Sequence, residues 1–178
     1  MNYKLLMTEG SDEKAFLEVL KEKNLLCFSE EELLMDGIYH KRQMDTQIKA
    51  YLQQLPCKDS VDIYRVGDKL TDEIRIPQSV STSKIRAKYK VCTLPEFEIL
   101  LILYEGLYGE FLKQKSKKKP SEFYKEKHKD YHKQVSYITD YFSEMSDNQI
   151  KDLIHLYVKE RGNTHKKDQL TLNVLIKN

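Results

Sequence analysis

The sequence contains no tryptophan and only three cysteines, Cys27, Cys57 and Cys92, which are far apart and form no CxxC pair. This scattered, odd-numbered set argues against a disulfide framework and against a cysteine-based zinc site. Glycine and proline are also scarce, at six and four residues. No glycine-rich phosphate loop is present, because residues 8–14 (TEGSDEK) have neither the Walker nor the GxGxxG spacing.

Long apolar runs are missing as well. The longest, Ile99 to Tyr104, is far too short to cross a bilayer. The beginning of the chain, MNYKLLMTEGSDEK, has neither a long apolar segment nor a small-residue cleavage site, so it does not read as a signal peptide. We therefore expect no membrane association and a cytoplasmic location.

A strong net charge is also lacking, since 30 basic residues nearly cancel 28 acidic ones and leave +2. Any argument for nucleic-acid binding must therefore rest on local clusters of charge. Hydrophobic residues make up 40% of the 178 residues, which is enough to build a core. The length fits one domain, or one domain with a substantial appendage.

The first seventy residues alternate between strand and helix patterns. Short apolar or β-branched runs end at Gly-containing turns, and segments with apolar residues at helical spacing lie between them. Such alternation predicts βαβ units, and hence an α/β fold with a mainly parallel sheet flanked by helices. The expected elements are strands at Lys4–Thr8, Leu33–Met35 and Val61–Val66, and helices at Ser11–Asn24 and Lys41–Leu55.

The second half of the chain has a different character. A long loop over Asp68–Ser83 precedes a fourth strand at Lys84–Cys92, and Thr93 is placed to cap a largely apolar, central helix. We expect residues 1–93 to form the α/β core and residues 94–178 a mainly helical extension packed on it. The tail from Leu170 to Ile176 fits either a strand or a helix, and we favour the helix. Further helices are expected at Ser121–His132, Gln134–Phe142 and from a cap at Ser146-Asp147 to about Glu160.

Two carboxylates stand where strands end. Glu9 follows the first strand, and Asp68 follows Val61–Val66 and Gly67. Ligands of open α/β sheets bind outside the carboxyl ends of the strands, so Glu9 and Asp68 are candidate catalytic residues. Together with Asp72 they are also candidate ligands for Mg²⁺, or for Mn²⁺ in its place.

Three further carboxylates are secondary candidates: Asp12, Glu73 and Glu96. Asp12 and Glu96 lie near expected helix starts, and Glu73 lies in the long loop. The alternative for the first two is a structural role, since acidic side chains favour the positive end of a helix dipole.

Basic residues gather in two places. Lys84, Arg86, Lys88 and Lys90 alternate, so on a strand they are expected to project from one face. Lys117, Lys118 and Lys119 belong to a compact run in the extension. Both clusters are candidates for holding a phosphate backbone. The alternative is a solvated surface of mixed charge, because acidic residues lie among the lysines that follow Pro120.

The segment LLMTEGSDEK, residues 5–14, resembles the first motif of Toprim domains, the topoisomerase–primase module. That resemblance implies that Glu9 is the family's acid/base and metal-associated glutamate. It also implies that Asp68 is the first aspartate of the family's Asp-x-Asp motif, whose second position here is Leu70. The extension is similar to those of small Toprim-like proteins of phage-defence and mobile-element settings.

Two functions follow as expectations. The first is a Toprim-like, Mg²⁺-dependent nuclease or phosphodiester-processing protein that acts on nucleic acid. The second is a catalytically degenerate module that binds nucleic acid or a protein partner, which the leucine in the second motif favours. An effector that acts only within a complex is a third reading. The sequence does not distinguish DNA from RNA or indicate an oligomeric state.

Overall fold

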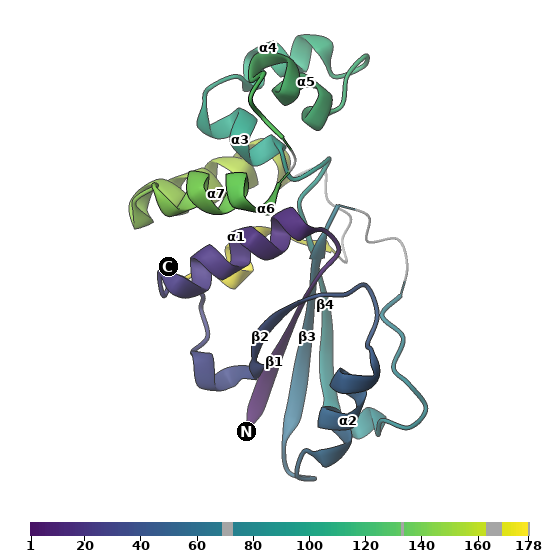
Figure 1. The fold of residues 1–178 in the computed structure, drawn as a ribbon. Coiled ribbons are helices and arrows are strands. Elements are labelled where there is room, and N and C mark those ends of the chain that lie inside the picture. The colour runs from purple at the N-terminus through teal and green to yellow at the C-terminus, as the bar shows by residue number, and fades with distance from the viewer. Residues whose placement is uncertain (69–72, 133, 163–168, 178) are drawn as a thin grey trace.

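The computed structural model describes residues 1–68, 73–132, 134–162 and 169–177. In this part of the chain, five strands form one sheet in the order β2-β1-β3-β4-β5, and every neighbouring pair is parallel (Figure 1). The predicted α/β class with a mainly parallel sheet is confirmed. The strands are β1 (Asn2–Thr8), β2 (Leu33–His40), β3 (Ser60–Gly67), β4 (Ile85–Cys92) and β5 (Gln169–Leu170).

Helices lie on both faces of the sheet and beyond its carboxyl edge. In Figure 1, α1, α6 and α7 lie on one side of the strands, α2 lies on the other, and α4 and α5 stand beyond the strand ends. The helices are α1 (Ser11–Glu22), α2 (Thr46–Gln54), α3 (Ile99–Tyr104), α4 (Tyr108–Gln114), α5 (Pro120–Lys127), α6 (Val135–Ser143) and α7 (Asp147–Arg161), with short 3₁₀ turns η1 (Glu30–Glu32), η2 (Thr82–Lys84) and η4 (Leu172–Leu175).

Alternation along the strands divides the interior into two hydrophobic clusters. On β1, Leu6 belongs to the larger cluster beneath α1, whereas Leu5 and Met7 belong to the smaller cluster beneath α2. The larger cluster continues through the C-terminal helices, and Phe16 of α1 meets Phe142 of α6 edge-to-face at 4.6 Å between ring centroids. Residues on both sides of position 93 therefore share one core.

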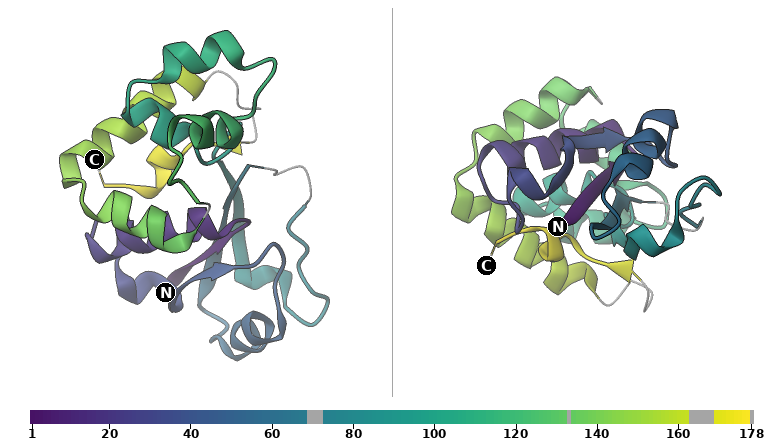
Figure 2. Two further views of the ribbon diagram at one scale, coloured as in Figure 1. Left: turned by 45° about the horizontal axis from the view of Figure 1, so that its top comes forward. Right: turned by 90° about the horizontal axis from the view of Figure 1, so that it is seen from below.

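The tail combines the two alternatives that its sequence allows. Gln169–Leu170 pairs in parallel with β4, and the predicted helix is reduced to the 3₁₀ turn Leu172–Leu175. Figure 2 shows this yellow C-terminal segment returning across the molecule toward the chain that follows α1. There, Leu26 and Ile176 form an antiparallel bridge, and the amide of Lys177 donates to the carbonyl of Leu25 at 2.8 Å.

The predicted end of the second strand is wrong. β2 does not stop at Met35 but continues through Asp36 and Gly37 to His40. Met35 and Asp36 adopt positive φ angles near 57°, and the register against β1 shifts between Lys4 and Leu6. The Asp-Gly pair therefore forms an irregularity within the strand instead of a turn that closes it.

Two helix starts also differ from the prediction. α2 begins at Thr46 instead of Lys41, because the side chain of Asp45 accepts the amide hydrogen of Ile48 at 3.0 Å and caps the helix there. α3 begins only at Ile99. Thr93 does not cap it, because its hydroxyl donates to Glu13 instead. Among the described residues, no helix has both the length and the apolar character needed to traverse a bilayer.

Candidate functional site

Glu9 and Asp68 lie at the same edge of the sheet. β1 and β3 run in parallel with Thr8 opposite Val66, so both chains leave the sheet at the same level. The ladder extends one residue further, because the amide of Glu9 donates to the carbonyl of Val66 at 2.9 Å. The carboxylates that follow these strands therefore meet at the carboxyl edge, where open parallel sheets bind ligands.

A pocket of about 140 Å³ opens at this edge, and both carboxylates line it. Its wall is strongly acidic, and a single cationic side chain, that of Arg42, faces the five carboxylates among its described lining residues. The pocket is lined by Glu9, Gly10, Ser11, Asp12, Glu13, Arg42, Asp68, Glu96 and Phe97.

Glu9 is held from several sides. It is 8% exposed, and its Oε1 lies 3.5 Å from Nε of Arg42. Its carbonyl oxygen lies 3.0 Å from Nε2 of His40, at the end of β2. A Cβ at Gly67 would stand 2.7 Å from Cβ and from Oε2 of Glu9, so the position before Asp68 leaves room only for glycine. The close approach of β3 thus fixes where the Glu9 carboxylate points.

Glu13, in the first turn of α1, is a third carboxylate of this pocket and was not among the predicted site residues. It is 5% exposed, and Oε1 accepts a hydrogen bond from the Thr93 hydroxyl at 3.2 Å. Burial raises the pKa of Glu13 to about 7, and the nearby charges of Asp12 and Asp68 add to that rise, while hydrogen bonds from the backbone and Thr93 oppose it. Near neutral pH this carboxyl group can therefore hold or release a proton.

The secondary candidates Asp12 and Glu96 also line the pocket, each with a structural contact. Asp12 is 1% exposed, and its Oδ1 accepts from the hydroxyl of Ser11 at 3.3 Å. Glu96 accepts from both the amide and the hydroxyl of Ser121, at 3.1 and 2.8 Å. Glu96 thereby joins the wall of the acidic pocket to the first turn of α5.

Of the other two acidic candidates, Asp72 and Glu73, the structure describes only Glu73. Asp72 lies outside the described residues, as does Leu70. Glu73 is exposed and lies at a separate cavity of about 200 Å³ with Ile74, Lys88 and Lys90. Its Oε1 is 3.5 Å from Nζ of Lys90.

The expectation that the basic residues of the fourth strand share one face is wrong. The register between β3 and β4 shifts after Val61, so that Asp62 stands opposite Ala87 and Ile63 opposite Lys88. Arg86 consequently turns to Asp62, while Lys88 belongs to the opposite face and donates to the carbonyl of Ile74 at 3.3 Å. An irregularity in the ladder breaks the period-two pattern on which the expectation rested.

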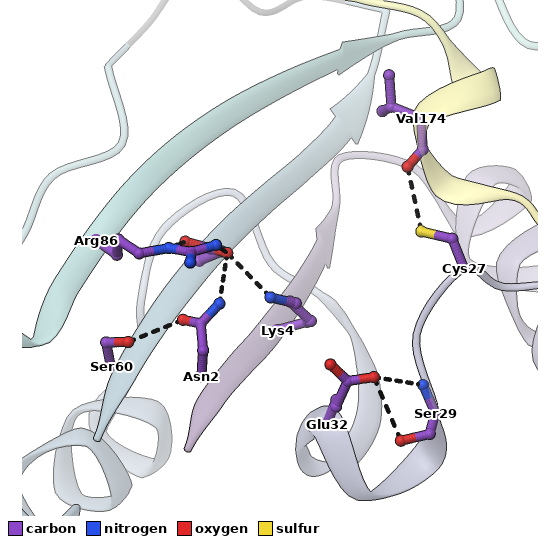
Figure 3. A network of polar contacts seen from close by, with 9 residues as sticks. Asn2, Lys4, Cys27, Ser29, Glu32, Ser60, Arg86 and Val174 are labelled. Carbon is purple, nitrogen blue, oxygen red and sulfur yellow. Dashed lines mark hydrogen bonds and ion pairs between the residues drawn. The ribbon is translucent and has the colours of Figure 1, made fainter. Parts of the chain in front are cut away.

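Lys84 and Arg86 bind groups of the protein itself. The ammonium of Lys84, in η2, donates to the carbonyls of Leu52, Gln53 and Leu55 at the end of α2. Arg86 binds the fully buried carboxylate of Asp62, which also accepts from Asn2 and Lys4 (Figure 3). Burial opposes ionisation of Asp62, but these hydrogen bonds prevail and lower its pKa to about 2.

Lys117, Lys118 and Lys119 lie between α4 and α5, at another cavity of about 600 Å³. The structure thus brings Glu9, Asp12, Asp68 and Glu96 into one pocket, which neither Glu73 nor any of the basic candidates lines. Arg42 and Glu13 were missed. Arg42 fell within the helix predicted at Lys41–Leu55, whereas α2 begins only at Thr46 and leaves Arg42 in the segment that follows β2. An acidic residue in the first helical turn after Glu9 was a usable signal for Glu13.

No three His, Cys, Asp or Glu side chains among the described residues converge in a geometry that could hold a metal ion. Comparisons of the chain with protein-family models, with curated proteins and with solved structures give no match. Functional interpretation therefore depends on the geometry of the acidic pocket.

Proposed function

We propose that the acidic pocket is the Mg²⁺-dependent catalytic site of a Toprim-like protein that processes phosphodiester bonds in nucleic acid. One observation carries the proposal: Glu9 and Asp68, which follow two neighbouring parallel strands, line the same pocket at the carboxyl edge of the sheet. The Toprim resemblance of residues 5–14 singles out the same glutamate, and the family's Asp-x-Asp motif, matched only at its first position, singles out the same aspartate.

The donor chemistry of the pocket fits the metal. Mg²⁺ prefers oxygen ligands and is commonly bound through one or two carboxylates, with water and substrate phosphate completing its shell. Glu9 and Asp68 supply two such carboxylates, and Asp72 is a further candidate ligand outside the described residues. A bound cation would also offset the mutual repulsion of the acidic side chains at this edge.

Each residue then has a role in the chemistry. Bound Mg²⁺ would polarise the phosphate and stabilise the charge that develops at the scissile bond. Glu9 acts as acid/base or as metal ligand, with Arg42 beside it to contact a phosphate oxygen. Glu13 can exchange a proton near neutral pH, because burial places its pKa at about 7.

A second candidate function is a degenerate module that binds nucleic acid or a protein partner without catalysis. Two observations favour it. Leu70 occupies the position of the second motif aspartate and cannot bind a metal. In addition, the guanidinium of Arg42 already lies 3.5 Å from Glu9 and offsets part of its charge without a metal ion. Such a module would use the pocket only to bind its partner.

Cleavage assays separate the two candidates. Single- and double-stranded DNA and RNA are incubated with the wild-type protein and either Mg²⁺ or Mn²⁺. We expect cleavage that falls by roughly 100-fold or more in Glu9→Gln and in Asp68→Asn, because both substitutions remove a charged oxygen donor from the reaction site. Glu73→Gln, which alters an exposed carboxylate at a different cavity, is the matched control and should cleave as the wild type does.

The absence of cleavage of all four substrates with both metals would contradict the nuclease proposal. If the wild-type protein bound nucleic acid without cleaving it, and Glu9→Gln left that binding unchanged, the degenerate module would be favoured.

A further inference from the structure

The cavity of about 600 Å³ lies outside the acidic pocket, in the helical extension. It is formed mainly by the segment between α4 and α5, together with the last residue of α7 and one residue that follows β4. In Figure 1, α4 and α5 stand beyond the carboxyl edge of the sheet. The lining residues are Pro95, Phe111, Lys115, Ser116, Lys117, Lys118, Lys119, Pro120, Glu122 and Arg161.

The lining is strongly cationic. Five basic side chains face one carboxylate, and that carboxylate, Glu122, accepts the backbone amide of Lys119 at 3.0 Å. Lys118 is paired with Glu126, whereas Lys115, Lys117 and Lys119 make no ion pair with any residue that the structure describes. Arg161 reaches the same cavity from a different helix, so the positive charge converges on a hollow and does not simply line one exposed helix.

The cavity also has an apolar part. Phe111 is 3% exposed, Pro120 is buried, and Pro95 is half-buried. A volume of this size matches pockets that take small organic ligands. Apolar side chains beneath a rim of lysines suit a ligand with both a flat or apolar body and negative charges, and a nucleotide unit with its phosphates has both.

The cationic cavity and the acidic pocket share a wall. Pro95 lines the first and Glu96 the second, and the Cα atoms of consecutive residues joined by a trans bond are only about 3.8 Å apart. Glu96 also receives both hydrogen bonds from Ser121, at the start of the helix whose first residue lines the cationic cavity. The two sites are therefore held at a fixed separation.

The proximity of the two sites has an electrostatic consequence for a negatively charged ligand. An acidic pocket with five carboxylates repels a phosphate backbone, so a polyanion approaches it only if nearby cations offset that repulsion. The five basic side chains on the other side of the shared wall supply the compensation.

We propose that the cationic cavity binds the backbone of a single nucleic-acid strand, with one nucleotide unit inside it, and leads that strand to the acidic pocket. A single strand is favoured over a duplex because the charges converge on a concavity, into which one flexible backbone can bend. The destination of the strand rests on the proposed function, but its binding in the cavity does not require catalysis.

The test measures binding in EDTA, so that cleavage plays no part in it. Fluorescence anisotropy compares a short labelled single strand with a duplex of the same sequence, for the wild type and for the triple variant Lys115→Gln, Lys117→Gln, Lys119→Gln. We expect the wild type to prefer the single strand, and the triple variant to bind it about tenfold more weakly with a shallower salt dependence. The matched control replaces three exposed lysines outside this cavity, Lys58, Lys129 and Lys159, and should bind as the wild type does.

Four results would overturn the inference: no single-strand binding by the wild type, equal or tighter binding of the duplex, unchanged single-strand affinity in the triple variant, or the same loss in the control variant. Binding that depends on the cavity lysines in a protein that cleaves nothing would support the inference and contradict only the proposed function. Cleavage by the triple variant, with its affinity for the single strand unchanged, would support the proposed function and contradict the inference.

Discussion

At the scale of single residues, Glu13 is the most informative member of the acidic pocket. Its ordinary pKa is 4.5, and burial raises it to about 7 in the folded protein. The folded state therefore retains a proton that the unfolded chain releases between these two values. Since the native state binds more protons in this window, the free energy of unfolding falls as the pH rises from 4.5 to 7.

Glu13→Gln should remove this pH dependence. We expect the variant to match the wild type at about pH 5 and to exceed it by up to roughly 3 kcal/mol at about pH 8, since the amide has no charge to bury. The measurement is urea unfolding at both pH values in EDTA. Glu22→Gln, an exposed site on the same helix, is the control. If Glu13→Gln and the wild type showed the same change in stability between the two pH values, the buried, proton-holding role of Glu13 would be refuted.

At the scale of elements, Lys84 connects the end of α2 to the start of β4 through hydrogen bonds. Three carbonyls at the end of α2 receive hydrogen bonds from its ammonium, and a cation at a helix C-terminus also complements the dipole. The side chain thereby holds α2 at the start of β4. Its role is structural, although the sequence pattern presented it as one of a row of phosphate contacts.

Lys84→Met should destabilise the protein by about 1–2 kcal/mol, because three carbonyls lose a charged donor while much of the aliphatic stem is kept. Chemical denaturation followed by circular dichroism gives the value. Lys88→Met provides the comparison, since Lys88 is exposed and donates to one carbonyl at 3.3 Å. Equal effects of the two substitutions would argue against the anchoring role.

The elements that the sequence predicts well are those with a strong local signal. β3 and β4 follow from β-branched and aromatic runs between turn residues, and α7 from its Ser146 cap. The irregular continuation of β2 and the bulge at Arg86 escape prediction, because both arise from pairing with a neighbouring strand. Similarly, the sheet order brings Glu9 to Asp68 as expected, whereas Arg42 and the burial of Glu13 depend on packing between distant segments.

At the scale of the whole molecule, the C-terminal tail closes the core. Leu172 and Leu175 are 1% and 0% exposed in the larger hydrophobic cluster, and the amide of Cys27 donates to the carbonyl of Leu175 at 2.9 Å. Residues 175–177 are thus packed against the segment that follows α1. A shared core of this kind favours cooperative unfolding of the α/β part and the helical extension.

Leu175→Ala should therefore destabilise the entire protein, by roughly 2–5 kcal/mol, because it opens a cavity in the common core. Thermal unfolding should remain a single transition at a lower temperature, whether it is followed by helix signal or by tyrosine fluorescence. Val174→Ala, at a half-buried neighbouring site, should cost less. Two separate transitions, with only one of them shifted, would show that the extension unfolds independently.

The central claim is that Glu9 and Asp68 form one cation site at the carboxyl edge of the sheet. Calorimetric titration of the metal-free protein with Mn²⁺ and with Mg²⁺ tests it most directly. We predict saturable binding of one ion by the wild type and by Glu73→Gln, and a loss of that binding in both Glu9→Gln and Asp68→Asn. Binding that survives either of these two substitutions unchanged, or no binding by the wild type, would contradict the account.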